Sequence, residues 1–437
     1  MHDYTKGAQE ILQGYPRGRR ELTGVIESLF SPAKTYRWFT EAGVPLKVED
    51  DGRVFPKSND AEDVVAALLK AAKDAGVQLS CGTKVMGVQQ QQEEGNFRVV
   101  VRKGGEVQRM TAAAVIVATG SASCGRDWAQ DMGHDIVDPV PSLFGFRLAP
   151  QSVLDGLAGV SLPDVELTLR DSVEASETGA KKKGKGKAGP AAKYARAAGV
   201  DPKAALCRRG PIMCTHSGIT GPAALQLSAY TARALADFRY KGTVSANFAP
   251  PLRAAQVIEA FQAARSGPDR KKRVATGATQ ILTSHPATDD VGKREALSIC
   301  GRVQEEWQLP KRLWLSICES VQLPDAASWA DLSDAHIKGL AEALTQAELR
   351  FVNRSPHKEE FVTAGGISSK QIDFRASDPM KSLSSKLTPG LYFCGEVLDA
   401  DGVTGGFNFQ SAWSTGYAAG HAAANYVLTL EEQGAIG

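Results

Sequence analysis

The residue types best suited to chemistry gather between positions 391 and 420, in LYFCGEVLDADGVTGGFNFQSAWSTGYAAG. The apolar run 391–394 predicts a buried strand, which turns through Gly395 and Glu396 into a loop with Asp399, Asp401 and Gly402. A helical pattern begins at the Thr-Gly-Gly sequence of 404–406. A strand, a glycine-rich turn and a helix N-terminus together present backbone N–H groups to an anion. The stretch therefore predicts an anion-binding site at the end of a strand.

Small residues recur every four positions along the helical part of this stretch, at Ala412, Gly416, Gly420 and Ala424. Residues with this spacing share one face of a helix. A face without bulky side chains can lie very close to a sheet. We therefore expect this stripe to pack against a sheet.

A second apolar run, AAVIVA at 113–118, ends in Thr119 and Gly120. It predicts a parallel strand that is buried on both faces and stops where a ligand can bind. The alternative is an ordinary turn after a strand. If the strands are parallel neighbours, the Thr119-Gly120 and Gly395-Glu396 turns lie at the same edge of one sheet.

Other polar positions have a functional and a structural interpretation. Arg53 and Phe55, in the turn DGRVFP at 51–56, either put a cation and an aromatic ring in a cleft or form a solvated turn. His216, in THSG, is either a proton donor or a structural residue. His134 lies at a helix-to-strand turn and is expected to be structural.

Several matches to known motifs are rejected on their context. GKGKAG at 184–189 fits G-x-G-x-x-G, but it follows no strand and lies in a low-complexity run of Lys, Ala and Gly. The acidic loop that begins at Asp399 lacks the glycine and glutamate of a calcium loop, because Thr404 and Gln410 stand there. No cluster of His and Cys predicts a metal site, and no ordering of Ser or Cys with His predicts a nucleophile.

The composition is that of a globular protein, with 437 residues, 43% apolar residues and a formal net charge of +2. This charge predicts no nucleic-acid partner, and no apolar run is long enough to span a membrane. The chain has seven cysteines, an odd number, and they are scattered along the sequence. This pattern favours a reducing compartment over a disulfide-linked protein. We expect a soluble intracellular protein, cytoplasmic or organellar.

The order of elements predicts an α/β domain with an insertion. Residues 1–141 and 351–437 form the α/β part, and 142–350 form the insert. The insert is expected to be β-rich over 142–250, with a disordered Lys-rich loop at about 176–206, and helical over 251–350.

The segment GEVLDADGVTGGFNFQ at 395–410 closely resembles the carboxyl-terminal flavin motif of the YhiN/BaiN-type flavoproteins. These are NAD(P)/FAD-dependent oxidoreductases, often labelled aminoacetone-oxidase-like. Five other stretches match in the family's order: DGRVFP at 51–56, VIVATG at 115–120, Gly133-His134 with 141–143, THSGITGPAALQL at 215–227 and VTAGGI at 362–367.

This resemblance implies FAD as the cofactor and a glutathione-reductase-like FAD-binding domain interrupted by a β-barrel-plus-helical insert. Gly395 and Glu396 are then expected at the flavin side chain, with Thr119 and Gly120 on the adenosine side. The pyrophosphate or the isoalloxazine edge is expected at Gly405, Gly406 and Asn408. Four more residues of the motif are expected near the cofactor: Asp399, Gly402, Thr404 and Gln410. The substrate face is expected to include Arg53, Phe55 and Thr363.

The chain departs from the family at its beginning. Family members open with a strand, G-x-G-x-x-G and a helix that hold the FAD pyrophosphate and adenosine, and no such pattern precedes the matching motifs here. The glycine-rich run after Gly120 is also shortened, to SASCGRDWAQDMGH. Two explanations stay open: an incomplete reading of the gene, or a derived protein that has lost half of its cofactor site.

The expected function is an FAD-dependent oxidoreductase of unspecified substrate, with NAD(P)H as a candidate electron donor. The alternative is a non-enzymatic binding or scaffold protein on a truncated flavoprotein fold.

Overall fold

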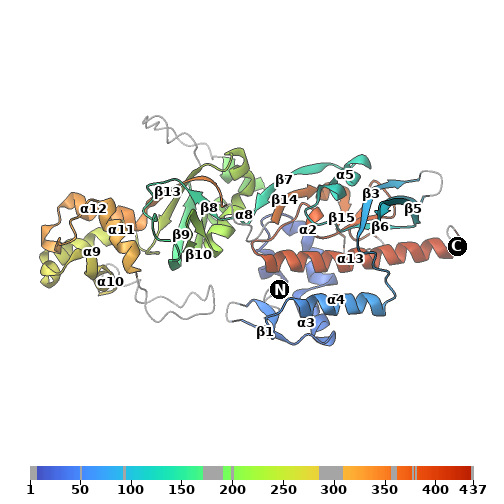
Figure 1. The fold of residues 1–437 in the computed structure, drawn as a ribbon, viewed down its shortest axis with the longest axis horizontal. Helices are drawn as coiled ribbons and strands as arrows, with labels where there is room; N and C mark the ends of the chain where they lie inside the picture. The colour runs from blue at the N-terminus through green and yellow to red at the C-terminus, as the bar shows by residue number, and fades with distance from the viewer. Residues whose placement is uncertain are drawn as a thin grey trace. The chain divides into compact units, whose positions relative to one another are not determined.

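The computed structural model describes residues 7–49, 52–91, 95–170, 190–197, 201–284, 309–355, 362–375, 378 and 381–434. The chain divides into two compact units. The first contains residues 1–140 and 362–437, and the second contains residues 141–361. The second unit is therefore inserted into the first (Figure 1).

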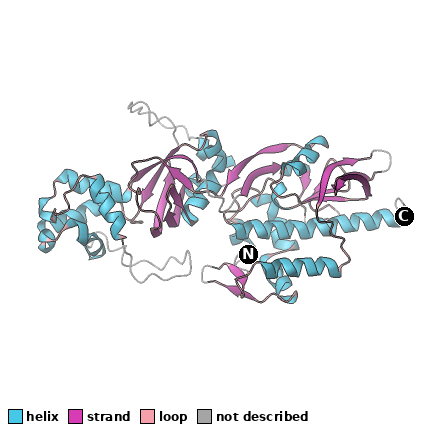
Figure 2. Cartoon of the chain, viewed as in Figure 1, coloured by secondary structure: helices cyan, strands magenta, loops and turns pink. Residues whose placement is uncertain are grey.

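Within its described residues, the first unit holds four small sheets (Figure 2). The sheet that carries the candidate site has the strand order β15-β16-β17-β6. Its strands are β6 (Val115–Val117), β15 (Ile372–Asp373), β16 (Ser384–Ser385) and β17 (Leu391–Phe393). The other three sheets pair β1 (Leu46–Val48) with β2 (Val54–Pro56), β7 (Ile136–Ser142) with β14 (Val362–Ile367), and β3 (Thr83–Gln90) with β4 (Phe97–Lys103) and β5 (Glu106–Ala112).

The β3-β4-β5 sheet is antiparallel throughout. Gly104 and Gly105 close the β4–β5 hairpin with φ angles of 55° and 91°. A two-residue hairpin with both central residues at positive φ favours glycine, because glycine has no Cβ to clash. These two glycines therefore determine the hairpin turn without any contact to distant residues.

The β6 strand differs from its prediction. The apolar run 113–118 was expected to be buried on both faces, but the strand covers only Val115–Val117, and the Ile116 side chain is 39% exposed. The reason is the strand order: β6 lies at the edge of its sheet among the described residues.

The helices of the first unit surround these sheets (Figure 1). They are α1 (Ala8–Leu12), α2 (Arg19–Gly24) with a π-helical turn at Val25–Leu29, α3 (Pro32–Glu41), α4 (Glu62–Asp74), α5 (Ser123–Asp131) and α13 (Gly405–Glu432). Ser31 caps α3 by accepting a hydrogen bond from the Lys34 N–H at 3.3 Å, and Pro32 follows it in the first helical position.

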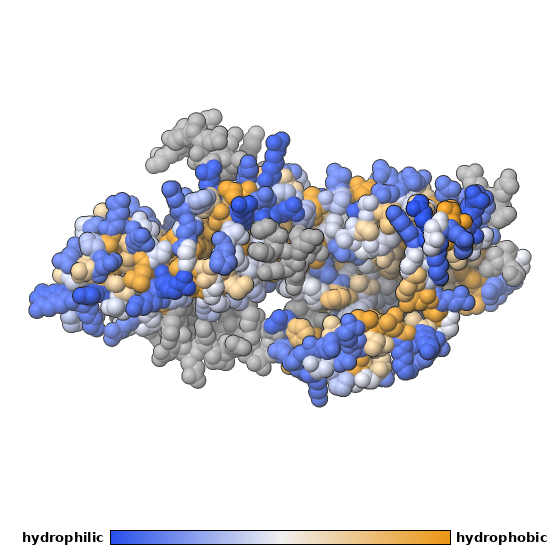
Figure 3. All heavy atoms as spheres, viewed as in Figure 1, coloured by the Kyte–Doolittle hydropathy of each residue, from blue (hydrophilic) through white to orange (hydrophobic). Residues whose placement is uncertain are grey.

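Helix α4 is amphipathic, but its apolar face is only partly covered. Ala67 is its single buried residue, while Val65, Leu68 and Leu69 are exposed. Figure 3 shows hydrophobic side chains gathered on the surface over this helix. The exposed apolar side chains of α4 therefore form a group on the surface and do not stand singly.

The prediction for the small-residue stripe of α13 is wrong. A Cβ atom built at Gly416 or Gly420 would meet nothing within 4 Å, and Ala424 is exposed. The buried face of α13 is instead formed by Ser411, Thr415, Ala418 and Ala422, among others. These side chains are also small, so α13 has two faces that permit close packing, and the sequence could not tell them apart.

The second unit contains a closed barrel with the order β10-β11-β8-β13-β12-β9 (Figure 2). Its strands are β8 (Phe146–Leu148), β9 (Ser161–Leu169), β10 (Cys207–Cys214), β11 (Gly218–Thr220), β12 (Gly242–Asn247) and β13 (Ala347–Arg354). Inward residues alternate with outward ones along β13, where Leu349 and Phe351 are buried and Glu348 and Arg350 are exposed. Residues 347–350 were expected to be helical, but this alternation makes them part of the last barrel strand.

The helices of this unit are α6 (Pro190–Ala197), α7 (Pro202–Leu206), α8 (Pro222–Asp237), α9 (Ala254–Ser266), α10 (Val274–Ser284), α11 (Lys311–Ser320) and α12 (Asp334–Thr345). A loop was expected through residue 206, and α6 and α7 form there instead. The Lys-rich core of that loop, at 180–189, lies outside the described residues.

None of the helices in the described ranges combines the length and the apolar character that a membrane span requires.

His134 is a buried residue that holds the candidate-site sheet to α5. Its Nδ1 lies 2.9 Å from the Ala129 carbonyl oxygen and its Nε2 lies 2.8 Å from Ser385 Oγ. A carbonyl oxygen can only accept, so Nδ1 carries the proton and Nε2 accepts from the serine hydroxyl. Burial lowers the pKa of His134. The ring is therefore held neutral, in the structural role that the sequence suggested.

We predict that His134 makes the protein sensitive to acid. Its folded pKa lies below the unfolded value of about 6.5, so the unfolded chain binds the proton more readily and stability falls as the pH drops from about 6.5 towards 5. Replacing His134→Gln should flatten this dependence in urea unfolding at a series of pH values. His216 is exposed, so His216→Gln serves as the matched control. Identical pH profiles for both variants would contradict the assignment.

Candidate active site

The candidate site begins where two parallel strands end together. β17 pairs with β6 in parallel, with Phe393 opposite Val117. The Cys394 N–H donates to the Val117 carbonyl at 3.1 Å. The turns that follow, Thr119-Gly120 and Gly395-Glu396, therefore leave the same edge of one sheet. The carboxyl edge of a parallel sheet is where α/β folds bind ligands.

Gly395 forms the first turn of the site. Its φ angle is 73°, in the region that favours glycine, and a 3₁₀ turn, Gly395–Val397, follows β17. Its N–H donates to Thr415 Oγ1 at 2.9 Å, which ties the turn to α13.

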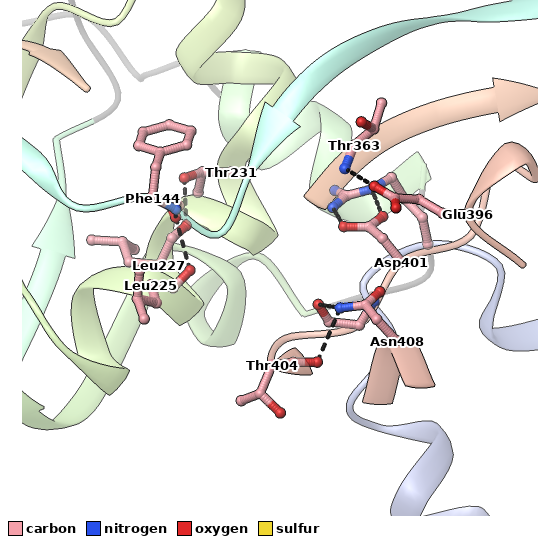
Figure 4. Close-up of polar contacts among 12 residues, drawn as sticks. Phe144, Leu225, Leu227, Thr231, Thr363, Glu396, Asp401, Thr404 and Asn408 are labelled. Atoms are coloured by element: carbon pink, nitrogen blue, oxygen red, sulfur yellow. Dashed lines mark hydrogen bonds and ion pairs between the residues drawn. The ribbon is translucent and has the colours of Figure 1, made fainter. Parts of the chain in front are cut away.

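Glu396 is fastened to a neighbouring strand. Its Oε1 accepts a hydrogen bond from the Thr363 backbone N–H at 2.8 Å (Figure 4). β14 approaches this closely because Gly366 follows, where a Cβ would lie 2.4 Å from the Val397 carbonyl oxygen. The structure thus brings Thr363 and Glu396 together, with the Thr363 backbone in an orienting position.

A buried ion pair anchors the loop that follows. The Arg17 guanidinium makes two charged hydrogen bonds to the Asp401 carboxylate, which is completely buried (Figure 4). Two-pronged pairing of this kind fixes geometry as well as charge. The pair links the loop to residues at the other end of the sequence.

Further bonds join the same two segments. The Val403 N–H donates to the Gly14 carbonyl at 2.9 Å, and the Tyr15 hydroxyl donates to the Phe407 carbonyl at 2.8 Å. A Cβ at Gly14 would lie 2.3 Å from the Phe407 ring. This segment, GYPRG at 14–18, was not predicted to be part of the site. Its two glycines around Pro and Arg were the available signal.

Asn408 closes the loop on itself. Its Oδ1 accepts from the Gly402 N–H at 2.9 Å, and its Nδ2 donates to the Gly402 and Thr404 carbonyls at 3.2 and 3.0 Å (Figure 4). Gly402 is required here, because a Cβ would lie 2.3 Å from that of Phe407. The Asn408 amide therefore shapes the loop by bonds within the chain.

The N-terminus of α13 is left open by this arrangement. Thr404 occupies the N-cap position with extended backbone angles and makes no side-chain capping bond. The first N–H groups of a helix have no partner within the helix. In α13, the N–H groups of Phe407 and Asn408 donate to the Thr404 carbonyl, and the first two N–H groups belong to Gly405 and Gly406. The positive end of this 28-residue helix therefore begins with two residues that have no side chains.

Two residues of the motif are held by the fold. Gln410 is buried, and its Nε2 donates to Thr35 Oγ1 and Ser414 Oγ, both at 2.9 Å. The Asp399 N–H donates to the Ile367 carbonyl at 3.2 Å, beside the bridge between Ile367 and Leu398. The structure thus places Gln410 against α3 and Asp399 at the end of β14.

Arg53 and Phe55 lie on a different element. Both side chains are exposed on the β1–β2 hairpin, and the Arg53 guanidinium lies 5.5 Å from the centre of the Phe55 ring. The buried side of that hairpin packs with Phe39 and, from α13, Trp413. The structure therefore groups Thr119, Gly120, Thr363 and the 395–408 loop, and it places Arg53 and Phe55 in a separate pair.

Two further groups characterise the sheet edge. Thr119 Oγ1 is buried and has no hydrogen-bond partner within the described part of the chain. The Cys394 thiol is buried, which raises its pKa to about 11 and keeps it protonated near neutral pH. Cys394 is therefore poorly suited to act as a nucleophile. Across the described ranges, no group of three or more His, Cys, Asp or Glu side chains is arranged to hold a metal ion.

The comparison with known protein families shows to which family the chain belongs. The profile described as the HI0933-like protein Rossmann domain matches residues 2–422. The chain belongs to this HI0933-like family. The resemblance to YhiN/BaiN-type flavoproteins is thereby confirmed over nearly the whole chain. At the level of the family, the match supports an α/β Rossmann-type domain and an FAD-dependent oxidoreductase.

Two curated relatives are similar to this chain over most of its length. A 3-dehydro-bile acid delta(4,6)-reductase from Clostridium scindens is 26% identical over 90% of this chain and 81% of its own length. A ribosomal RNA dihydrouridine synthase from Haemophilus influenzae is 25% identical over 86% of this chain and 76% of its own. A solved structure, Mycobacterium smegmatis Sdh1 in complex with UQ1, covers 98% of this chain and 59% of its own at 13% identity, with a TM-score of 0.36, too low to bear on the argument.

We predict that the Arg17–Asp401 pair holds the loop in place. The variant Asp401→Ala leaves a largely buried guanidinium unpaired, which should lower the free energy of unfolding by about 3–5 kcal/mol. The exposed Lys70–Asp74 pair is the control, and Asp74→Ala should cost at most about 1 kcal/mol. Urea unfolding of both variants measures the difference. Equal losses would show that the buried pair is not an anchor.

Proposed function

We propose that this HI0933-like protein binds FAD at the carboxyl edge of the β6–β17 pair and uses it in an oxidoreductase reaction. The α/β unit would hold FAD in the manner of a glutathione-reductase-like domain. The observation that carries the proposal is the open, glycine-flanked N-terminus of α13, joined through Gly395 and Thr415 to the end of β17. An anionic pyrophosphate is the kind of group that such a helix end stabilises.

The residues present fit this cofactor in three respects. The first N–H groups of α13 can donate to phosphate oxygens. The orphaned Thr119 Oγ1 leaves a buried polar atom at the same sheet edge for a ligand to satisfy. Glu396 offers a carboxylate that Thr363 orients, and carboxylates accept hydrogen bonds from sugar-alcohol hydroxyl groups.

In this proposal, FAD supplies hydride acceptance and donation when bound, and the chain supplies binding and orientation. Gly405 and Gly406 keep the helix end accessible to the cofactor. Asn408 and Asp401 act as positioning residues, since each holds the loop by bonds within the chain. The positive end of α13 favours negative charge that develops on a nearby ring. NAD(P)H is proposed as the electron donor.

We predict that FAD binding depends on the open end of α13. The variant Gly406→Leu adds a bulky side chain to the first turn, so FAD affinity should fall by at least about tenfold, or about 1.4 kcal/mol. The measurement is the change in flavin fluorescence as FAD is titrated into purified protein.

The matched control is Gly87→Leu in β3, where an added Cβ meets nothing within 4 Å and φ is not positive. It should bind FAD like the parent. If Gly406→Leu also binds FAD at the parent's affinity while folded by circular dichroism, the placement of the cofactor is wrong. If the parent itself gives no saturable signal, the proposal that this chain binds FAD is wrong.

A second proposal concerns the substrate, because the relatives act on unlike molecules, a bile acid and ribosomal RNA. The net charge of +2 hides an uneven distribution. Residues 190–273 of the second unit contain 14 Lys and Arg against 4 Asp and Glu. Lys193 and Arg196 on α6 and Lys203 on α7 are exposed, and these two helices pack on each other and on α8. Such a local excess of basic residues favours an RNA substrate over a steroid.

We predict that RNA binding is confined to this basic region. The triple variant Lys193→Glu, Arg196→Glu and Lys203→Glu should lose most of its retention of a ribosomal RNA fragment in low-salt filter binding, because each change replaces a phosphate-attracting charge with a repelling one. The control makes the same change at Lys84, Arg98 and Arg102, which are exposed in the first unit. Equal losses in the two variants, or no retention by the parent, would rule out RNA as the substrate class.

A further inference from the structure

Two neighbouring arginines of β10 have different environments. Arg209 makes two charged hydrogen bonds to the Asp164 carboxylate, at 2.7 and 2.8 Å. Arg208 instead lies over the ring of Tyr230 on α8, with its guanidinium carbon 3.6 Å from the centre of the ring. Successive side chains of a strand point to opposite faces. One face of β10 therefore carries an arginine paired with an acid, and the other carries an arginine stacked on an aromatic ring.

The strand register shows on which face Arg208 lies. Arg208 is opposite Leu167 of β9, while Arg209 is opposite Glu166. Side chains that are directly opposed in an antiparallel pair share one face of the sheet. Leu167 is completely buried in the core of the second unit. Arg208 therefore points to the inner side of the barrel wall, and α8 packs against the two strands, β9 and β10, that form this part of the wall.

Arg208 is a half-buried cation without a carboxylate partner among the described residues. Its Nε is buried and has no hydrogen-bond partner there. The side chains that favour its charged form are Tyr230 and Cys207, and neither is a carboxylate. Burial lowers the pKa of Arg208, whereas the hydrogen bonds to Asp164 raise the pKa of Arg209. The fold thus withdraws the Arg208 guanidinium from water without compensating its charge.

A charge in this position is unfavourable unless an anion compensates it. A cation taken out of water destabilises the fold when it has no partner, and an aromatic ring offsets only a part of this cost. A buried N–H group without an acceptor adds to the cost. Natural proteins keep such groups mainly where they serve a function. The environment of Arg208 therefore indicates a binding site for an anion.

The surroundings of Arg208 favour a phosphate group as this anion. Helix α7, with the exposed Lys203, packs against both β10 and α8. Two acidic side chains of the region are engaged locally, since Asp201 caps α7 and Asp237 accepts a hydrogen bond from the Tyr194 hydroxyl at 2.8 Å. A guanidinium matches a phosphate in shape and charge, because its planar fork of N–H groups can donate to two phosphate oxygens.

We propose that Arg208, stacked on Tyr230, binds a backbone phosphate of the RNA and anchors the strand beside the exposed cations of α6 and α7. This inference rests on the proposed RNA substrate. Tyr230 acts as a positioning residue, since its ring holds the guanidinium plane and less entropy is lost when the phosphate binds. Salt screens a partly buried charge pair less than an exposed one. The contact therefore persists at salt concentrations that weaken the contacts of the surface lysines.

RNA retention tests this anchor with Arg208→Met and Arg209→Met as a matched pair, since both changes lower the net charge by one. For Arg208→Met, the affinity for a ribosomal RNA fragment should fall by about tenfold or more, as expected when hydrogen bonds to a charged group are lost. The slope of log affinity against log salt concentration should become shallower by about 0.7 to 1, as for one lost phosphate contact. Arg209→Met should keep the parent's slope, because Asp164 already neutralises Arg209.

Urea unfolding of the RNA-free protein separates this role from a purely structural one. If Arg208 serves only to pack on Tyr230, Arg208→Met should lower the urea midpoint and leave the RNA affinity of the folded protein unchanged. If Arg208 binds phosphate, its removal should leave the midpoint unchanged or raise it, because an uncompensated charge is lost. A lower midpoint together with the parent's RNA affinity would therefore overturn the proposal.

Inorganic phosphate tests the site apart from RNA. A ligand that binds only the folded chain stabilises it, so phosphate should raise the melting temperature of the parent above its value in chloride of equal ionic strength. The rise should be smaller for Arg208→Met. General effects of the salt on the protein surface act on both proteins alike. Equal rises in the two proteins would contradict a phosphate site at Arg208.

The anchor and the proposed RNA substrate fail in different ways. If phosphate stabilises the parent through Arg208 but the parent retains no RNA, the RNA substrate is wrong and the site binds phosphate from another source. If the parent retains RNA and Arg208→Met retains it with the same affinity and salt slope, the RNA substrate stands and Arg208 is not its anchor.

Discussion

The parallel pairing of β17 with β6 is the constraint on which the candidate site depends. These strands are 274 residues or more apart in sequence, yet each is only three residues long. The register that sets Phe393 opposite Val117 brings the Thr119 and Gly395 turns to one edge. A shift by one residue would exchange buried and exposed side chains along β6 and separate the two turns. His134 and α13 pack against this pair, so they support its register as well as its stability.

Several polar groups of the loop from Gly395 to Asn408 are bonded within the chain. Asp401 is held by Arg17, Asn408 by Gly402 and Thr404, and Glu396 by the Thr363 backbone. A site that is ordered before its ligand arrives loses less entropy on binding. The residues of this motif thus divide into those that are free to contact a ligand and those that hold the loop. The open end of α13 is best placed to contact a ligand, and Asn408 is best placed to hold the loop.

Local patterns in the sequence predicted the strand, the turn and the helix of this site, because hydrophobic periodicity and glycine positions are local signals. They could not predict the Arg17–Asp401 pair, whose partners are 384 residues apart. The two small-residue faces of α13 were confused because Ser, Thr, Ala and Gly all permit close packing. The β13 strand was hidden because it follows α12 after a single residue, although its alternation of buried and exposed residues was readable. The open edge of β6 depends on strand order, which no single segment encodes.

The open edge and the candidate site share one strand, so an event at the edge has consequences for the site. Val115–Val117 is short, and its carboxyl end leads directly to Thr119 and Gly120. Short edge strands fray more readily than central ones, because they have hydrogen bonds on one side only. Fraying of β6 would move the turn that carries Thr119 and Gly120, so the geometry of the candidate site depends on how firmly β6 is held.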